Sequence, residues 1–440
     1  MNTSWYETAC FYHMNPLTLC GAPPYQDHCL AYRLSKIEQW LDHLVGMGFN
    51  ALYLGPVFDS LSHGYDTTDY YTLDPRLGDN QTLVNLIHTC HQRGIKVILD
   101  GVFNHTGREF FAFRDIEKNK EESPYKKWYR NVCFTTEGFT YENWRGCEEL
   151  AVFDLTNSEV QDYLLSVAQF WKEQFHIDGL RLDCADSLDL GFLEALHRQV
   201  KSNDPDFFLL GEVIHGDYRE RANKKMLDSV TNYELHKALY SAHNDHNLFE
   251  LAYSANREFG PEGMYRELSL YNFVDNHDVD RLASKLQDKH HLFNIYTLLF
   301  SFKGTPSVYY GSEWGIKGKK SGDDDRPLRP SLEVSQIQKG NQDLLSHIHG
   351  LIALRKEHEA LILGDYTQLY LQSDQYAFKR ETRQESILVL TNAAATEATI
   401  TVPSEKEYHY LWGLDCSFKQ TDTLLIATLA PFQTLLLGSL

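Results

Sequence analysis

Acidic and basic residues interrupt one of the apolar stretches of the chain, FHIDGLRLDCAD at residues 175–186. Arg181 and Asp183 are two positions apart, so in a β-strand their side chains lie on the same face. If that face is buried, both charges need partners, because desolvating an unpaired ion costs several kcal/mol or more. By itself, the pair fits a structural salt bridge as well as it fits a carboxylate that a guanidinium positions for chemistry.

The same arrangement, an apolar run that ends in an acid or an imidazole, recurs at three other places. The runs are KVILDGVFNH (96–105), FFLLGEV (207–213) and LYNFVDNHD (270–278). We interpret each as a buried parallel strand with polar side chains at its carboxyl end. In an α/β barrel, the carboxyl ends of the strands surround the active site. The pattern therefore predicts one site that contains Asp100, Asn104 and His105, then Glu212, then Asn276, His277 and Asp278.

The elements that would position these residues belong to the α/β class, as a (β/α)8 TIM barrel. The spacing of apolar residues predicts three helices. The first covers residues 34–47 and ends at Gly48, the second ends at Gly94, and the third covers residues 343–355. Ser158 and Gln161 fit a capping box for a helix whose apolar stripe ends at Phe175. The expected strands are residues 9–14, 50–58, 95–103, 179–183, 207–212, 229–232, 271–275 and 306–311.

Two segments depart from the alternation of strands and helices. Helical or strand periodicity is lost in residues 106–154, and about fifty residues is too long for an ordinary strand-to-helix connection. We interpret this segment as an inserted domain beside the site. The short alternating runs after residue 364 predict an antiparallel β-domain. The expected organisation is a barrel formed by residues 1–105 and 155–363, an inserted domain at 106–154, and a C-terminal β-domain at 364–440.

The motifs DGVFNH (100–105), GLRLD (179–183), GE (211–212) and FVDNHD (273–278), preceded by HGYDTTDYY (63–71), occur in this order. In that order they resemble the α-amylase superfamily, glycoside hydrolase family thirteen. The resemblance covers nearly the whole chain. It is nearest to the cyclomaltodextrinase, neopullulanase and maltogenic amylase branch, through GYDTTDYY, LGDNQTL (77–83) and GEVIHGD (211–217).

The resemblance implies a retaining α-glucan hydrolase that cleaves α-1,4 and in some cases α-1,6 bonds of malto-oligosaccharides, cyclodextrins or starch fragments. Retention requires two carboxyl groups about 5 to 5.5 Å apart. Asp183 would be the nucleophile, Glu212 the general acid and base, and Asp278 the acid that steadies the distorted sugar. Arg181 would orient Asp183 and lower its pKa, whereas desolvation would raise the pKa of Glu212.

Further positions match residues that contact sugar in the family. Tyr65 would stack on the ring in the cleavage subsite, and His105 and His277 would bind its hydroxyl groups. Asp66, Asp325 and Arg326 would lie near the next sugar. For each of these residues taken alone, an ordinary structural role remains open; Asp278, for example, could simply cap a helix beginning at Val279.

The chain departs from starch-binding members of the family three and four residues after Asp183. Those enzymes often have Lys-His there, whereas this chain has Asp186 and Ser187. The resemblance therefore does not imply that this chain has the subsite that binds the leaving sugar in those enzymes. It also gives weaker support for a calcium ion, because the calcium shell of those enzymes includes the backbone of that His. We expect no cofactor. If calcium binds, Asn104 and Asp154 are the residues that could supply oxygen ligands.

Two other functions stay open at this point. A transglycosylase or a disaccharide isomerase or phosphorylase would use the same three acids and differ only in the acceptor that reaches the intermediate. A non-catalytic sugar-binding or scaffold relative belongs to another class. Such relatives lose the acids and gain a membrane anchor, whereas all three acids are present here.

The composition restricts the partners of the chain. Asp plus Glu number 61 against 41 Lys plus Arg, a net charge of −20, which opposes binding to nucleic acid or an anionic membrane. The longest apolar region, residues 292–302, is too short to span a bilayer.

The start of the chain lacks the pattern of a signal peptide, and the 8 cysteines show no metal-finger spacing. We expect a cytoplasmic protein with reduced thiols that binds neutral α-glucan oligosaccharides. It would be a monomer or homodimer, although the β-domain that builds the dimer in the cyclomaltodextrinase branch does not precede Ala9.

Overall fold

Eight parallel strands form the centre of the computed structural model, which describes residues 3–136, 138–322 and 324–439. They hydrogen-bond in the order β13-β12-β11-β5-β2-β1-β15-β14. A parallel bridge between Thr231 and Tyr271 joins the two edges, so the sheet closes into a barrel, which confirms the predicted fold class. The strands are β1 (Phe11–Met14), β2 (Ala51–Leu54), β5 (Lys96–Gly101), β11 (Gly179–Leu182), β12 (Phe208–Gly211), β13 (Ser229–Val230), β14 (Tyr271–Phe273) and β15 (Thr305–Tyr309).

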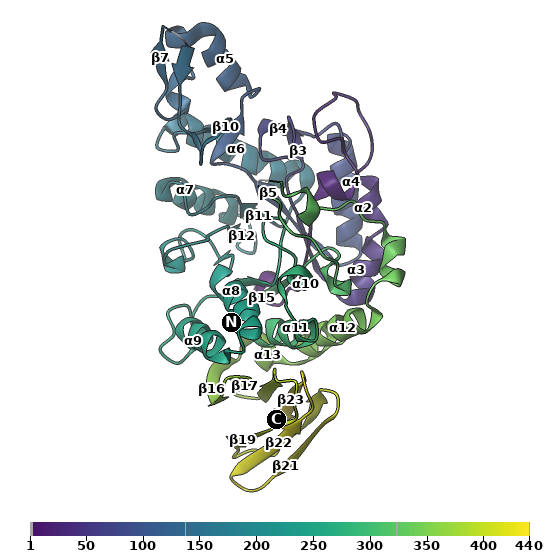
Figure 1. Ribbon diagram of the computed structural model, residues 1–440. Helices are drawn as coiled ribbons and strands as arrows, with labels where there is room; N and C mark the ends of the chain where they lie inside the picture. The colour runs from purple at the N-terminus through teal and green to yellow at the C-terminus, as the bar shows by residue number, and fades with distance from the viewer. Residues whose placement is uncertain (1–2, 137, 323, 440) are drawn as a thin grey trace.

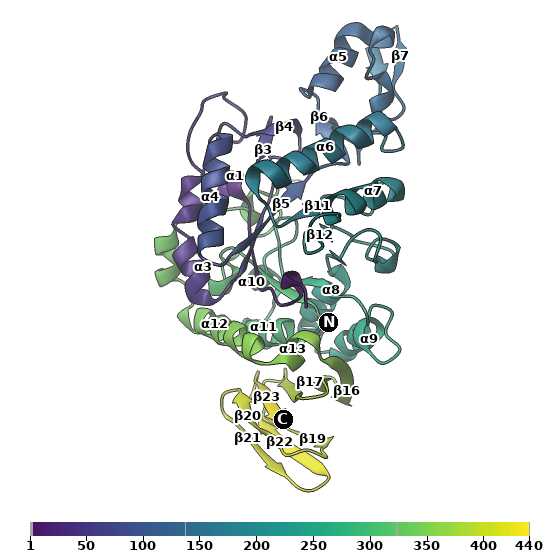
Figure 2. The ribbon, with the colours of Figure 1, turned by 180° about the vertical axis from the view of Figure 1, so that it is seen from behind.

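Helices surround the barrel, as Figures 1 and 2 show from opposite sides. Helix α6 illustrates why they pack there, because its apolar stripe from Val160 to Phe175 is buried against the strands. The helices are α1 (Pro16–Leu19), α2 (Ser35–Glu38), α3 (Leu41–Met47), α4 (Asn80–Gln92), α6 (Ser158–Phe175), α7 (Leu190–Lys201), α8 (Tyr233–Asn244), α9 (Leu248–Phe259), α10 (Leu282–Lys285), α11 (His291–Ser301), α12 (Gln342–Glu357) and α13 (Glu359–Leu363).

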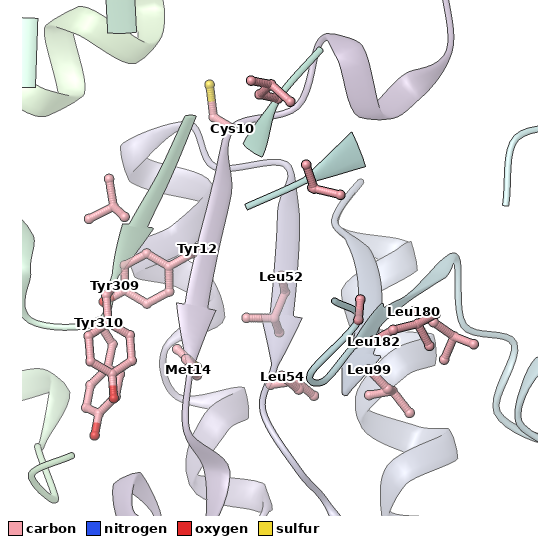
Figure 3. Close-up of a cluster of buried hydrophobic side chains, with 14 of the residues drawn as sticks. Cys10, Tyr12, Met14, Leu52, Leu54, Leu99, Leu180, Leu182, Tyr309 and Tyr310 are labelled. Atoms are coloured by element: carbon pink, nitrogen blue, oxygen red, sulfur yellow. The ribbon is translucent and has the colours of Figure 1, made fainter. Parts of the chain in front are cut away.

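Alternate residues of each strand face the interior of the barrel or the helices. Outward side chains such as Tyr12, Leu52 and Leu180 belong to the main hydrophobic core, part of which Figure 3 shows. Inward side chains such as Phe11 and Tyr53 form a separate apolar cluster inside the barrel. Polar inward residues are placed by the same alternation toward the carboxyl ends of the strands.

Several predicted elements differ in the structure. The helix expected over 34–47 is two helices, α2 and α3, separated by a turn, although Gly48 ends α3 in the left-handed conformation with φ of 90°. The strand expected over 50–58 ends at Leu54; β3 (Phe58–Ser60) and β4 (Thr67–Leu73) then form a hairpin. The capping box at Ser158 is wrong, because the side chain of Asn157 accepts the hydrogen bond from Glu159 N instead.

The inserted segment after β5 has regular structure that its sequence did not reveal. It contains one amphipathic helix, α5 (Phe111–Asn119), whose short apolar side buries Ala112, Phe113 and Ile116. Two small antiparallel sheets complete it, built from β6 (His105–Gly107), β7 (Cys133–Thr135), β8 (Gly138–Thr140), β9 (Asn143–Trp144) and β10 (Cys147–Val152).

The C-terminal residues form two antiparallel sheets at the end of the molecule opposite the inserted segment (Figure 1). A second hydrophobic core, which includes Leu388 and Leu435, lies among these strands. Arg380 attaches them to the barrel by donating a 2.6 Å hydrogen bond to Ser301 O. The strands are β16 (Asp365–Leu371), β17 (Gln375–Glu381), β18 (Ser386–Asn392), β19 (Ala398–Pro403), β20 (His409–Trp412), β21 (Cys416–Gln420), β22 (Leu424–Leu429) and β23 (Thr434–Ser439).

Among the residues that the structure describes, no helix combines the length and the apolar character needed to cross a lipid bilayer.

Candidate active site

A cleft of about 880 Å³ opens at the carboxyl ends of the barrel strands. It lies between the inserted segment, which contributes Trp144, Arg145, Cys147 and Leu150, and the loop that follows β15, which contributes Lys320, Asp325 and Arg329. Its floor carries most of the residues that the sequence singled out, among them Tyr65, His105, Asp183, Glu212 and Asp278.

Arg181 lies at the centre of the buried charges. Strand register places it opposite Asp100 on β5, and its Nη1 donates to Asp100 Oδ1 at 2.9 Å and to Asp183 Oδ1 at 2.8 Å. Its Nη2 lies 2.8 Å from Glu212 Oε1, at the end of β12. One guanidinium therefore contacts three carboxylates, so the cluster is short of positive charge.

The electrostatics of Asp183 differ from the expectation. Burial raises the pKa of Asp183, and the carboxylates of Glu212 and Asp100 raise it further, to about 7, despite the Arg181 guanidinium, which lowers it. The prediction that Arg181 would keep this pKa low is wrong, because one cation cannot offset burial together with two more carboxylates.

Cys184, which follows the nucleophile candidate, was missed as a site residue. It has φ of 48°, a left-handed conformation that is uncommon for a residue with a side chain, and its Sγ donates to Asp183 Oδ2 at 3.0 Å. Burial and the neighbouring carboxylates Asp183 and Glu212 raise the pKa of the thiol, so it is protonated and can donate.

Glu212 is held by donors from three directions. Besides Arg181, the backbone N of Cys184 donates to Oε2 at 3.1 Å, and the Tyr233 hydroxyl donates to Oε1 at 3.3 Å. The preceding residue, Gly211, leaves little room for a side chain, because a Cβ there would lie 2.9 Å from Ala185 Cβ and 2.4 Å from Leu227 Cδ1. Tyr233 begins α8, and no sequence motif pointed to it.

Asp278 is bound on two sides by cationic or imidazole groups. Its Oδ2 lies 3.0 Å from His277 Nε2, and its Oδ1 accepts from Arg329 Nη2 at 3.1 Å. Burial raises the pKa of Asp278, but His277, Arg329 and Arg181 outweigh it and hold that pKa well below its usual range. The alternative of a helix cap fails, because Asn276 Oδ1 accepts from the backbone N of Asp278 and Val279.

Tyr65 and His105 both line the cleft. The Tyr65 ring is parallel to the His277 ring, with centroids 5.7 Å apart, and its hydroxyl lies 2.5 Å from His277 Nε2. His105 stacks on Trp144 of the inserted segment at 6.0 Å. Burial lowers the pKa of His105 to about 4, so its ring is neutral at neutral pH.

The three residues expected near the next sugar have different locations. Asp325 lines the cleft. Asp66 is buried below the cleft surface, where its carboxylate accepts from the N and Oγ of Ser62. Arg326 points away and pairs with Asp324. The guanidinium that reaches the cleft belongs instead to Arg329, which pairs with both Asp278 and Asp325.

The two residues considered for calcium, Asn104 and Asp154, each use an oxygen in a hydrogen bond within the protein. Calcium takes six to eight oxygen ligands. Asp154 Oδ1 is occupied by the N and Oγ1 of Thr156, at 3.1 and 2.7 Å. The Asn104 carbonyl accepts from Phe153 N at 3.0 Å, and its amide lies 3.2 Å from His105 Nδ1. Two of the oxygens that these residues could offer to calcium are therefore already hydrogen-bond acceptors within the protein.

Comparison with known proteins gives one family and a consistent group of relatives. Residues 33–332 match the model of the α-amylase catalytic domain. The chain is 34% identical over 397 residues to the cyclomaltodextrinase of Thermoanaerobacter pseudethanolicus, covering 86% of this chain and 67% of that protein. It is 31% identical over 362 residues to the intracellular maltogenic amylase of Bacillus subtilis, covering 81% of this chain and 60% of that protein. Thus the matched part spans about two thirds of the length of these relatives.

Among solved structures, the debranching enzyme of Nostoc punctiforme superposes with a TM-score of 0.88 at 28% identity, over 100% of both chains. The structure of a cyclomaltodextrinase superposes with a TM-score of 0.86 at 29% identity, covering 99% of this chain and 78% of that one.

Proposed function

The chain belongs to the α-amylase family, and on that premise we propose that it is a retaining glycoside hydrolase of short α-glucans. The bonds are α-1,4 and also α-1,6 glucosidic bonds, since a similar solved structure at 27% identity is named a cyclic α-maltosyl-(1→6)-maltose hydrolase. The observation that carries the proposal is the contact of Asp183 and Glu212 with one buried guanidinium, at the bottom of an open cleft.

In the first step, Glu212 gives a proton to the glycosidic oxygen while Asp183 attacks the anomeric carbon. Three carboxylates around one guanidinium favour keeping one proton in the cluster, since like charges in a buried site disfavour full ionisation. In the proposed mechanism this proton is on Glu212 when the sugar is bound, because the retaining reaction needs one protonated carboxyl group and one ionised nucleophile. Asp183 is then the ionised partner of Arg181.

In the second step, Glu212 removes a proton from water, and the water attacks the same carbon to release the sugar with retained configuration. Asp278 stays ionised between His277 and Arg329 throughout. A fixed negative charge there stabilises the positive charge that develops on the sugar ring in the transition state. Tyr65, His105 and His277 bind the sugar in this subsite.

The decisive experiment compares Asp183→Asn, Glu212→Gln and the wild type on maltotriose and cyclodextrins. We expect each variant to lose kcat by about 10²-fold to 10⁴-fold or more, because it removes a group that acts only in reaching the transition state. Circular dichroism spectra and melting curves control for folding. Early products followed by NMR should be the α-anomer. Either variant retaining more than about a tenth of the activity, or β-anomer as the first product, refutes the assignment.

Hydrolysis and transglycosylation differ in the molecule that accepts the glycosyl group from the enzyme, which is water in hydrolysis and a sugar in transglycosylation. Addition of glucose or maltose, or of inorganic phosphate, should change the product distribution only slightly if water is the usual acceptor. A large yield of longer sugars or of sugar phosphate would instead indicate a transglycosylase or a phosphorylase.

Location and assembly remain part of the proposal. One relative is named an intracellular maltogenic amylase, and we propose a cytoplasmic location for this chain as well. We propose that the protein is a monomer or a homodimer, which light scattering at micromolar concentration distinguishes. No nucleic-acid partner is proposed, in keeping with the net charge of −20.

A further inference from the structure

Three side chains of different chemistry converge in the cleft floor. His105, Asp183 and Cys184 each offer a ligand atom, and these atoms all lie within 4.8 Å of one another. Their residues are 1%, 6% and 8% exposed. In the part of the chain that the structure describes, no other group of three His, Cys, Asp or Glu side chains meets this condition.

The backbone brings the thiol into this group. Cys184 directly follows β11, and its left-handed conformation, with φ of 48°, turns the side chain toward Asp183. Its Sγ lies 3.0 Å from Asp183 Oδ2. Non-glycine residues in this conformation are concentrated at functional sites.

The imidazole of His105 has a free ring nitrogen. Its Nδ1 lies 3.2 Å from the Asn104 side-chain amide, whereas its Nε2 is buried and has no hydrogen-bond partner. A metal-bound histidine usually donates its other ring N–H to an oxygen nearby. Turning the Asn104 amide so that its oxygen accepts from Nδ1–H leaves the Nε2 lone pair for a ligand.

The charges of the floor favour a cation. Asp100, Asp183 and Glu212 surround the single guanidinium of Arg181. Full ionisation would leave an excess of negative charge in a buried site, and a divalent cation relieves it.

We infer that His105, Asp183 and Cys184 form a binding site for a borderline-soft divalent cation such as zinc, which blocks the cleft. Zinc takes nitrogen, sulfur and oxygen ligands at about 2.0 to 2.3 Å in tetrahedral geometry, with the fourth position open to water. Calcium and magnesium prefer oxygen alone and do not fit a thiol and an imidazole. As the zinc–sulfur bond forms, the S–H bond breaks and its proton passes to solvent.

The consequence for activity rests on the proposed function, since zinc would occupy Asp183 and the nitrogen proposed to bind a sugar hydroxyl. Inhibition should therefore be competitive with oligosaccharide. Binding itself does not depend on the proposed function and is measured separately.

The experiment uses the full chain, freed of metal by a chelator and then transferred to chelator-free buffer. Cobalt is added as a spectroscopic substitute for zinc, because a thiolate bound to cobalt gives a charge-transfer absorption band. We expect the band in the wild type, its loss in Cys184→Ala, and zinc binding at least about tenfold weaker in that variant by equilibrium dialysis. Cys147→Ser is the matched control, because this thiol lines the same cleft but lies outside the group; it should keep the band.

Zinc-edge X-ray absorption of the zinc-loaded wild type serves as a measurement that needs no variant, with one sulfur and otherwise nitrogen or oxygen ligands expected. A band that persists in Cys184→Ala, a band lost in Cys147→Ser, or a zinc shell without sulfur overturns the site. Zinc binding with the expected ligands in a protein that hydrolyses no glucan leaves the site standing and refutes the proposed function. Activity that zinc does not reduce, or that magnesium reduces equally, overturns the proposed blocking.

Discussion

Arg181 is the residue on which the charge of the cleft floor depends. Its two terminal nitrogens contact Asp100, Asp183 and Glu212, so removing it would leave three buried carboxylates without a cation. Like charges in a buried site raise carboxyl pKa values, and pKa values shifted in this way are concentrated at functional sites. The protonation of the cleft floor therefore depends on the number of carboxylates that surround the Arg181 guanidinium.

The raised pKa of Asp183 predicts the acidic limb of the pH profile. This pKa is about 7, because burial and two neighbouring carboxylates disfavour ionisation. Lowering the pH through this value protonates the nucleophile, so kcat/KM should fall by up to about tenfold per pH unit on the acidic side. The measurement is kcat/KM at constant ionic strength from about pH 5 to 8. A value of kcat/KM that stays constant down to pH 5 would contradict the predicted acidic limb.

Two arginines three positions apart provide a matched test of the cleft wall. The Arg329 side chain is 6% exposed and binds Asp278, whereas the Arg326 side chain is 79% exposed and pairs with Asp324. Arg329→Ala should lower kcat/KM by about 10²-fold, because Asp278 and the Tyr65 ring lose the group that positions them. Arg326→Ala should change it by less than about twofold, as expected of an exposed ion pair.

Arg329→Lys separates positioning from folding in this test. It keeps the charge but not the planar fork, so we expect partial recovery of kcat with a melting temperature near that of the wild type. Equal losses of activity in Arg326→Ala and Arg329→Ala would show that Arg329 does not position Asp278 for the reaction.

The inserted segment is the element that completes the cleft. β10 pairs with β6, which begins at His105, so the segment is attached to the end of β5. Through this pairing, Trp144 reaches the His105 ring. The joint also brings Phe153 against Asn104, through the hydrogen bond from Phe153 N to Asn104 O.

We predict that this joint needs no calcium. The backbone carbonyl of Asn104 accepts from Phe153 N, and Asp154 Oδ1 accepts two hydrogen bonds from Thr156. Incubation with EGTA should leave both the melting temperature and kcat unchanged. The control is reconstitution with calcium, magnesium or zinc separately. Loss of activity and of thermal stability, restored by calcium alone, would refute this prediction.

The arrangement of the whole molecule is the basis for a prediction about substrate length. The inserted segment and the loop carrying Asp325 and Arg329 wall the cleft, and the C-terminal sheets lie at the other end of the molecule (Figure 2). Of the residues expected near the next sugar, Asp66 is buried and Arg326 points to solvent, whereas Asp325 lines the cleft together with Arg329. We propose that the barrel (residues 1–105 and 155–363), the inserted domain (106–154) and the C-terminal β-domain (364–440) are separate domains.

A walled cleft of about 880 Å³ is of the size of a small-molecule site. We therefore predict that kcat/KM is highest for substrates of about three to eight glucose units, since longer chains gain no further contacts inside a cleft of this size. The measurement compares maltotriose, maltoheptaose, cyclodextrins, pullulan and soluble starch at equal glucose mass. Faster attack on starch, with a rapid fall in iodine staining, would indicate an open cleft that cuts within long chains.

The sequence by itself determined the barrel and the gathering of the acids. Strand alternation is local geometry, so the spacing of Arg181 and Asp183 was enough to place them on one face, and apolar runs ending in acids were enough to place Glu212 at the same edge. The family motifs likewise occupy the ends of strands, where the backbone direction determines the position of a side chain.

Only the tertiary structure decided the properties that depend on distant neighbours. The choice of Arg329 over Arg326, the burial of Asp66 and the approach of Cys184 to His105 occur in loops, whose side chains are directed by contacts far along the chain. The pKa of Asp183 depends on everything that covers it and on Asp100 and Glu212, which lie on other strands. Desolvation and the balance of charges are properties of the assembled site, and no spacing of residues in one segment contains them.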